Sequence, residues 1–258
     1  MKRAVLIAAF VLVIASCGGS DDSAVTTTSS TAPAETTATS DGSTTTESTT
    51  STTVESTTTT TMPATTTTLD VVPLEQPAIW PAPDEVFTSP EAAAEDFVSS
   101  VLGVPPALGE FQQGDSRSGE IEVFSLPEPG GVAVVRGVLL MRQLGPDDGW
   151  FVLGAVNEFN TITSPESMAQ VAAGPITVAG SARGFEGAIV VEAFVAGSPV
   201  LLDQQFTQAG SQAEPAPYSV MLDLTGAPSG QTVLLIVRGG TGLETDPGEF
   251  SAIPVVVS

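Results

Sequence analysis

The chain has 258 residues, with 30 Asp and Glu against 7 Lys and Arg, and it carries a formal net charge of −23. It contains no histidine and one cysteine, which excludes Ser-His-Asp and Cys-His nucleophiles, histidine-based metal sites and any intramolecular disulfide. So acidic a surface should also repel nucleic acid and anionic lipid headgroups. We expect no cofactor and no metal. Any catalysis would have to rest on carboxylates, tyrosine, arginine or serine, for example on a carboxylate pair of the glycosidase type.

The N-terminal residues 1–16 have the layout of a secretory signal peptide. Lys2 and Arg3 form a positively charged start, and residues 4–15 are an unbroken apolar run. That run is shorter than the roughly 20 residues that an apolar helix needs to span a bilayer. We therefore predict a cleaved signal peptide and an extracytoplasmic location.

Cys17 follows this run, and residues 14–17 read Ile-Ala-Ser-Cys. The tetrapeptide resembles the lipobox of bacterial lipoproteins. The resemblance implies that Cys17 is diacylated through its sulfur, with fatty acids such as palmitate, and becomes the mature N-terminus. Two acyl chains would anchor the protein stably to the extracytoplasmic face of the cell membrane. The alternatives are an ordinary secretory signal with an unrelated cysteine, and a retained transmembrane helix.

Residues 17–83 are dominated by Ser and Thr, with pure threonine over residues 57–61 and 65–68. Because such a segment cannot bury apolar surface, we predict a disordered stalk between the lipid anchor and the folded part. As a flexible coil its ends would lie about 40 Å apart, which could lift a domain into a cell-wall layer. The same composition is typical of O-glycosylated stalks. Near its end, Trp80 is expected to pack back on the first folded domain.

Residues 84–160 predict a small α+β domain. Residues 89–91 (Ser-Pro-Glu) supply the N-cap, the first-position proline and the first-turn acid of a helix, which Gly103 ends. Its apolar face consists of Ala94, Phe97, Val98, Val101 and Leu102. Strand patterns then occupy residues 120–126, 132–144 and 150–156. One helix on an antiparallel meander of three or four strands is the expected arrangement.

A glycine-flanked loop, residues 114–120, is the most distinctive piece of this domain. Asp115, Arg117 and Glu120 could together bind a ligand or a cation from its tip. The structural alternative is that Asp115 caps a turn and Arg117 pairs with a neighbouring acid. These three residues are our candidate binding loop.

Residues 161–258 contain no helical pattern. Strand patterns recur at residues 161–163, 176–179, 188–195, 200–206, 218–224, 232–238 and 253–257. The alternation is clearest where Tyr218, Val220 and Leu222 face inward and Ser219 and Met221 outward. About seven short strands in about 100 residues predict an immunoglobulin-like β-sandwich, so the folded part should be mainly β.

Several segments of this region resemble a known domain family. They are residues 162–165 (Ile-Thr-Ser-Pro), 176–182 (Ile-Thr-Val-Ala-Gly-Ser-Ala), 184–187 (Gly-Phe-Glu-Gly), 237–240 (Val-Arg-Gly-Gly) and 253–257 (Ile-Pro-Val-Val-Val). The family is the bacterial spore-germination immunoglobulin-like domain, which often occurs beside GerM-type domains. The resemblance implies an extracytoplasmic, non-enzymatic domain that binds or scaffolds. We identify no GerM-type domain beside it in this chain.

Two loops of this second domain allow more than one interpretation. We expect Phe185 to be a core plug and Glu186 a solvated residue at a sheet edge, although Glu186 could also contact a partner. Glu244, Asp246 and Glu249 could form a calcium loop, but their spacing does not match the EF-hand pattern.

The sequence as a whole favours a non-catalytic, lipid-anchored surface protein that binds or scaffolds a cell-envelope protein or a wall component. One alternative is a module that binds wall glycans, and it would need an exposed Trp80 or Tyr218. A less favoured alternative is a hydrolase of wall polymer, and it would need a tight cluster of carboxylates in a cleft.

Overall fold

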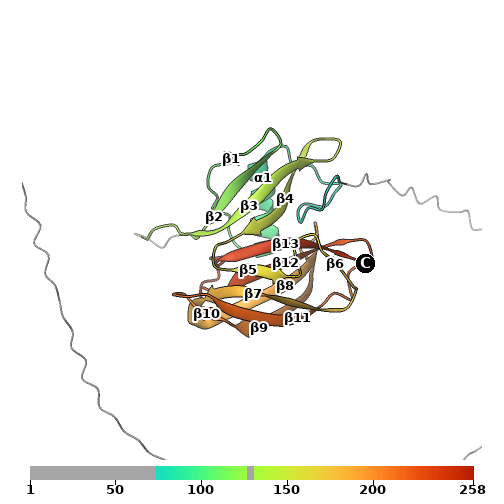
Figure 1. Cartoon of the computed structure of the whole chain (residues 1–258). Helices are drawn as coiled ribbons and strands as arrows, with labels where there is room; N and C mark the ends of the chain where they lie inside the picture. The colour runs from blue at the N-terminus through green and yellow to red at the C-terminus, as the bar shows by residue number, and fades with distance from the viewer. Residues whose placement is uncertain (1–73, 127–130) are drawn as a thin grey trace, which may run out of the picture. The chain divides into compact units, whose positions relative to one another are not determined.

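The computed structural model describes residues 74–126 and 131–258 (Figure 1). This part of the chain holds one α-helix and 13 strands, arranged as antiparallel sheets in a sandwich-like way, so the expected mainly β fold is confirmed. The predicted signal peptide, Cys17 and residues 17–73 of the predicted stalk lie outside the described residues. Residues 74–83, which the prediction also gave to the stalk, are described, and Ala78, Ile79 and Trp80 among them are buried. Among the described residues, no helix is long and apolar enough to cross a membrane.

The helical segment begins and ends where the sequence predicts. Helix α1 spans Pro90–Phe97 and continues as a π-helical turn, Val98–Leu102 (η1). The Ser89 hydroxyl accepts a hydrogen bond from the Ala92 amide at 3.2 Å, which caps the first turn. Gly103 ends the segment in the left-handed conformation, with φ of 70°. The predicted apolar face is buried throughout.

Four antiparallel strands form the meander beside this helix. They are Gln112–Gln113 (β1), Ser118–Phe124 (β2), Val135–Leu144 (β3) and Gly149–Val156 (β4). On β2, Ile121 and Val123 are fully buried while Glu120 and Glu122 face solvent, as the alternation predicts. Strand β3 begins three residues later than predicted, because Val132 and Val134 lie exposed ahead of it.

Nine strands make up the rest of the described chain. They are Thr161–Ser164 (β5), Gln170–Val171 (β6), Pro175–Gly184 (β7), Ala188–Val195 (β8), Leu201–Gln208 (β9), Gly210–Ser211 (β10), Ala216–Asp223 (β11), Thr232–Gly239 (β12) and Phe250–Val257 (β13). Seven of them correspond to predicted strands, and β8 has the predicted bounds. Strand β7 runs further than predicted, because its small residues hide the alternation. Gly180 is one of them, and a side chain there would overlap the Thr161 carbonyl of β5.

One sheet runs through both predicted domains. Its order is β1-β2-β3-β4-β13-β12-β8-β9, with β6 paired to β13, and the second sheet is β10-β7-β11 with β5 paired to β7. Strands β4 and β13 meet at a single pair, Ala155 opposite Ala252. A side chain at Gly154 would come within 2.8 Å of the Ala252 carbonyl oxygen, so this junction requires a glycine. The sheet thus continues across the predicted boundary at residue 160.

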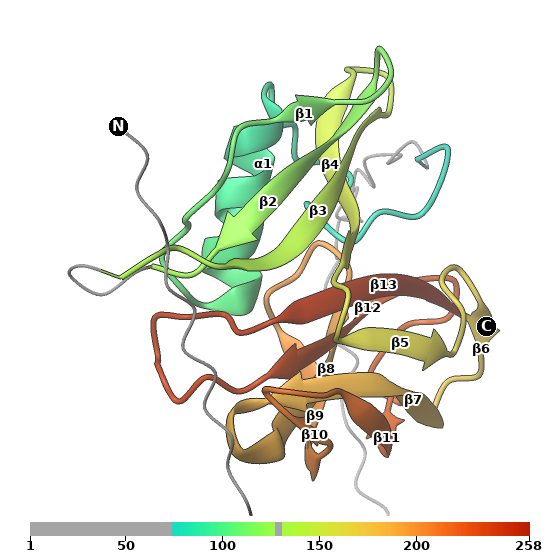
Figure 2. The same cartoon turned by 60° about the vertical axis from the view of Figure 1, so that its left-hand side comes forward.

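Two hydrophobic cores lie on opposite faces of strands β8, β12 and β13. The first core packs α1, η1, Ile79, Trp80 and strands β2–β4 against one face, and the second packs β7 and β11 against the other (Figures 1 and 2). Strand β12 supplies alternate side chains to each core. Its first-core residues are Leu234 and Ile236, and its second-core residues are Val233, Leu235 and Val237. Burial of both faces explains why this strand reads as one continuous apolar run.

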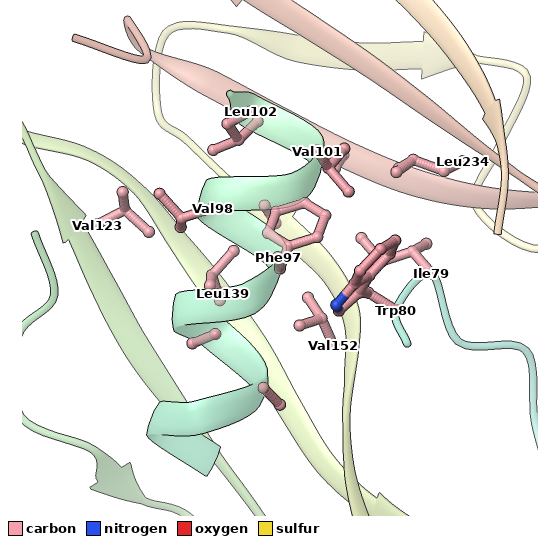
Figure 3. Packing of buried hydrophobic residues seen from close by; sticks show 14 of the residues in the cluster. Ile79, Trp80, Phe97, Val98, Val101, Leu102, Val123, Leu139, Val152 and Leu234 are labelled. Carbon is pink, nitrogen blue, oxygen red and sulfur yellow. The ribbon is translucent and has the colours of Figure 1, made fainter. Parts of the chain in front are cut away.

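The first core closes around the helix. Figure 3 shows Phe97 on the face of α1 that is turned toward Trp80 and the β12 residue Leu234. Trp80 is buried, pairs with Val152 of β4 through its backbone, and donates from its indole nitrogen to Asp96 at 2.8 Å. The prediction that Trp80 packs back on the first folded domain is confirmed.

Phe185 does not plug the core, so that prediction is wrong. The residue is 45% exposed and begins a 3-10 turn, Phe185–Gly187 (η2), between β7 and β8. Glu186 and Gly187 both adopt positive φ, 54° and 75°, which breaks the strand alternation at this point. Phe185 therefore lies at the end of the sandwich, and Glu186 is solvated as expected.

Candidate binding site

The predicted binding loop forms a cluster of exposed charges. The Arg117 amide donates to the Asp115 carboxylate at 2.7 Å, and this bond is the main reason why the pKa of Asp115 is lowered. The Arg117 guanidinium donates to Asp148, in the β3–β4 turn, at 2.8 Å, and Arg142 lies 4.0 Å from Asp115. Both contacts of the structural alternative are therefore present: Asp115 caps the turn and Arg117 pairs with an acid.

Glu120 does not join this cluster. It lies on β2 opposite Gln112 of β1 and Leu140 of β3, and its side chain faces solvent. Within the described residues, no hydrogen bond or ion pair links its carboxylate to Asp115 or Arg117. The loop therefore brings two of the three predicted residues together and leaves the third on the neighbouring strand.

A more enclosed site lies at the end of the sandwich where η2 meets the β12–β13 loop. We call it the sandwich-end pocket, and its volume is about 220 Å³. It is lined by Arg136, Arg183, Gly184, Phe185, Gln212, Gly239, Gly240, Thr241 and Glu249. These residues come from β3, β7, η2, the segment after β10, β12 and the β12–β13 loop, which are far apart in the sequence (Figure 2).

Two largely buried ion pairs form the floor of this pocket. Arg136 donates from Nε to Asp246 at 2.9 Å and from Nη2 to the second carboxylate oxygen, and Asp246 is only 4% exposed. Arg183 binds Glu249 in the same two-fold manner, with both distances at 2.8 Å. The hydrogen bond that Arg183 donates to Glu249 is the main cause that raises the pKa of Arg183. Two-point pairing fixes both guanidinium groups in position.

A buried asparagine ties these pairs to the backbone. Asn160 accepts a hydrogen bond from the Arg183 amide at 2.8 Å and donates one to the Glu249 carbonyl at 2.7 Å. The Asn157 side chain donates to the Arg136 carbonyl at 3.0 Å and accepts the Asn160 amide. The segment between β4 and β5 is thereby joined to β3, β7 and β13, and the polar groups of the pocket floor are held rigidly.

A third pair lies next to the pocket. Arg238 on β12 contacts Glu192 on β8 at 2.7 Å, and it also donates to the Leu102 carbonyl at the end of the helical segment at 3.2 Å. Gln204 of β9 donates to the other Glu192 oxygen at 2.7 Å. With this pair, every arginine of the described part of the chain has an acidic partner.

Two of the three acids proposed for a calcium loop are already paired with arginine. Asp246 and Glu249 are each bound at two points by an arginine, and Glu244 is exposed on the loop between them. Across residues 74–126 and 131–258, no three acidic or cysteine side chains are grouped so that they could hold a metal ion.

The aromatic residues that the glycan alternative would need are buried. Trp80, Trp150 and Tyr218 are the only tryptophans and tyrosine of the chain, and none is more than 9% exposed. The Tyr218 hydroxyl donates to the Thr161 carbonyl at 3.1 Å, and burial raises its pKa. No indole or phenol ring is therefore free to stack on a sugar.

Sequence patterns do not predict the sandwich-end pocket, because the residues that pair in it are far apart in the chain. Arg136 and Asp246 are 110 positions apart, and Arg183 and Glu249 are 66 apart. One signal was available: beyond Arg3 the chain has only five arginines, and Arg136, Arg183 and Arg238 sit in strands among apolar or small residues. A cation in such a position needs a buried acidic partner.

Of three comparisons with known proteins, the one with family models found a match. Neither the search of curated proteins nor the search of solved structures found a match. The sequence model of one family matches residues 161–239, from the start of β5 to the end of β12. This part of the chain is therefore similar to the immunoglobulin-like domain of bacterial spore germination, the Gmad2 domain.

Proposed function

We propose that this protein is a non-catalytic, lipid-anchored protein on the extracytoplasmic face of the membrane, where its folded unit binds or scaffolds a cell-envelope partner. The observation that carries the proposal is the immunoglobulin-like domain over residues 161–239. A fold alone does not define a function, so a site must support it. The sandwich-end pocket is such a site, because it combines an exposed aromatic ring with rigidly held polar groups.

The anchor and the stalk are inferred from sequence. The lipobox-like residues 14–17 and the apolar run before them support lipidation at Cys17. The Ser/Thr-rich segment that follows supports a tether that presents the folded unit away from the membrane.

The paired carboxylates support a binding role over hydrolysis. A glycosidase needs two carboxyl groups that face a substrate, one to donate a proton and one to act as base or nucleophile. In the described part of the chain, the buried carboxylates Glu192 and Asp246 are both bound to arginine, as is the largely buried Glu249. An ion-paired carboxylate is a poor proton donor at neutral pH. The burial of Trp80, Trp150 and Tyr218 weighs against wall-glycan binding in the same way.

Affinity capture tests the binding role. Residues 64–258 would be immobilised and exposed to solubilised membrane and wall fractions, beside a column that carries an unrelated protein of similar negative charge. We expect one envelope protein to be enriched on the first column alone, as identified by mass spectrometry. Retention of wall polymer would favour the glycan alternative. If nothing is retained beyond the control column, the binding proposal is wrong.

Fractionation tests the anchor separately. We expect the protein to partition with membranes and the Cys17→Ser variant to be released, with an N-terminal peptide whose mass includes acyl chains only in the unaltered protein. Lipidation would be contradicted if the N-terminal peptide of the unaltered protein still contained residues 1–16. It would also be contradicted if the Cys17→Ser variant stayed bound to the membrane.

A further inference from the structure

Two exposed apolar side chains belong to the adjoining loops at this end of the sandwich. Phe185 and Leu243 are 45% and 50% exposed, and they belong to η2 and the β12–β13 loop. The Phe185 amide donates to the Gly240 carbonyl at 2.7 Å, which joins the two loops. The Phe185 ring also lies close to the backbone of Gly242. We call these two residues, with Glu158, Glu186, Glu214 and Glu244 around them, the sandwich-end surface.

The backbone holds Phe185 outward. Glu186, the next residue, adopts φ of 54° although it is not a glycine, and such conformations persist only where surrounding structure imposes them. Gly187 continues the tight turn, and its carbonyl accepts a hydrogen bond from the Ala209 amide at 3.0 Å. The exposure of this aromatic ring is therefore fixed by the fold rather than by a freely rotating loop.

The acids of this surface are not neutralised. In the described residues, Glu158, Glu186, Glu214 and Glu244 take part in no ion pair, whereas every arginine is already paired. The negative charges of Glu158 and Glu214 contribute to the raised pKa of Arg183, so both residues lie near this arginine of the pocket. The surface thus combines exposed apolar area with an excess of negative charge.

This charge balance decides which ligand fits. The two guanidinium groups of the pocket floor are each held by a carboxylate at two points, so an anionic ligand would meet charges that are already compensated and four further acids. A cation would instead meet those free carboxylates and the face of the Phe185 ring. Aromatic faces attract Lys and Arg side chains, and opposite charge favours encounter between partners.

We propose that the sandwich-end surface binds a Lys- or Arg-bearing segment of a partner protein, with Phe185 against the cationic side chain and Glu186 and Glu244 pairing with its charge. This inference rests on the proposed binding function, because it names the chemistry of the partner. The chain itself supplies no such segment after Arg3, since it contains no further lysine and its five remaining arginines are paired.

A peptide-binding experiment tests the surface. The chain from residue 17 onward, made soluble by Cys17→Ser, would be titrated into a short fluorescein-labelled peptide of lysine, leucine and serine, and into the same peptide with glutamine for lysine. We expect only the lysine peptide to bind, more weakly as salt rises to about 0.15 M. Phe185→Ala should weaken its binding at least about tenfold, as for an aromatic hot spot, and the double change E186Q/E244Q several-fold.

Matched variants separate this site from general attraction to an acidic protein. Phe206→Ala removes another exposed ring, 77% exposed on β9, and E110Q/E122Q removes two exposed acids near β1 and on β2. Both should leave binding unchanged, and the tryptophan emission of every variant should report an intact fold. Equal losses in the control and test variants, or no binding of the lysine peptide, would overturn the proposal.

The capture experiment, repeated with Phe185→Ala, separates the two proposals. A partner that the unaltered fragment retains and the variant loses would support the surface. Equal retention by both would overturn the surface proposal and leave the binding function standing. Retention by neither would overturn the binding function itself.

Discussion

The two cores differ in composition but share strands β8, β12 and β13. The first contains the buried aromatic residues Trp80, Phe97, Trp150, Phe194 and Phe250 around a helix, whereas Tyr218 is the one aromatic among the buried residues of the second. Strands β8, β12 and β13 separate them and give side chains to both. An immunoglobulin-like sandwich usually exposes the outer face of each sheet. Here one outer face is covered by the helix and the meander, so each core depends on the other.

The matched immunoglobulin-like residues therefore do not make up the whole folded body. They end at Gly239, while β13 and the acids Asp246 and Glu249 follow. Strand β13 pairs with both β12 and β4 and so completes the sandwich and the meander together. We predict that the region before residue 161 acts as a cover that stabilises this sandwich.

Separating the two regions should have the largest effect. Residues 161–258 alone would expose Leu234, Ile236 and Phe250, and each loses about 1.5–3 kcal/mol of burial free energy. A typical domain has only about 5–15 kcal/mol of stability in total. We expect this fragment to lack a cooperative thermal transition by circular dichroism, whereas residues 64–258 melt cooperatively. A fragment with dispersed amide resonances and a sharp transition would show that the cover is dispensable.

Substitutions on the two faces of β12 should cost similar amounts. Ile236→Ala opens a cavity in the first core and Leu235→Ala opens one in the second, and both residues are fully buried. Each should lower the free energy of unfolding by about 2–5 kcal/mol, measured by urea denaturation. Val132→Ala, at an 85% exposed position, is the control with a change near zero. A negligible effect of Ile236→Ala alone would show that the first core contributes little to this strand.

The buried and exposed ion pairs give a smaller contrast. Arg136→Met leaves Asp246 buried without a partner and should cost about 2–3 kcal/mol, less than for a fully buried pair because Arg136 is 18% exposed. Arg117→Met breaks an exposed pair with Asp148 and should cost less than about 1 kcal/mol. Urea denaturation measures both. If the double change R136M/D246L is no more stable than Arg136→Met, the loss does not come from the uncompensated carboxylate.

Acid should affect the tip of the meander only slightly. The pKa of Asp115 is lowered in the folded state, chiefly by the hydrogen bond from the Arg117 amide. A lowered folded-state pKa means that the carboxylate stabilises the loop above its unfolded pKa of about 3.9, and that this stabilisation is lost as the pH falls through the folded value. Titration of the Asp115 carboxyl by NMR should give a pKa below this unfolded value. A midpoint at or above the unfolded value would contradict the cap.

Local signals in the sequence predicted most elements, and long-range contacts explain what they missed. The helix is specified by Ser89, Pro90 and Gly103, and β8 by a run of apolar residues, all within a few positions. Strand β7 was predicted too short because close approach to β5 requires Gly180, and a glycine carries no alternation. Periodicity also cannot reveal that one sheet continues from β4 into β13, since a single residue pair makes the junction.

The sandwich-end pocket was missed by the sequence for the same reason. Asp115 and Arg117 stand out because glycines flank them, and the structure shows an exposed turn held by local contacts. Phe185 was predicted to be buried as an apolar residue that leads into β8, but the positive φ of Glu186 turns the chain outward. The arginine pairs of the pocket join residues that only the folded sheet brings together.

Unfolding followed by the fluorescence of the two tryptophans tests most directly whether the two cores unfold together. Trp80 and Trp150 both lie in the first core, while Leu222 is fully buried in the second. Leu222→Ala should lower the stability by about 2–5 kcal/mol. If the cores form one cooperative unit, the urea midpoint of tryptophan fluorescence falls with that of circular dichroism. An unchanged tryptophan midpoint, with a separate earlier transition in circular dichroism, would show that the immunoglobulin-like domain unfolds independently of its cover.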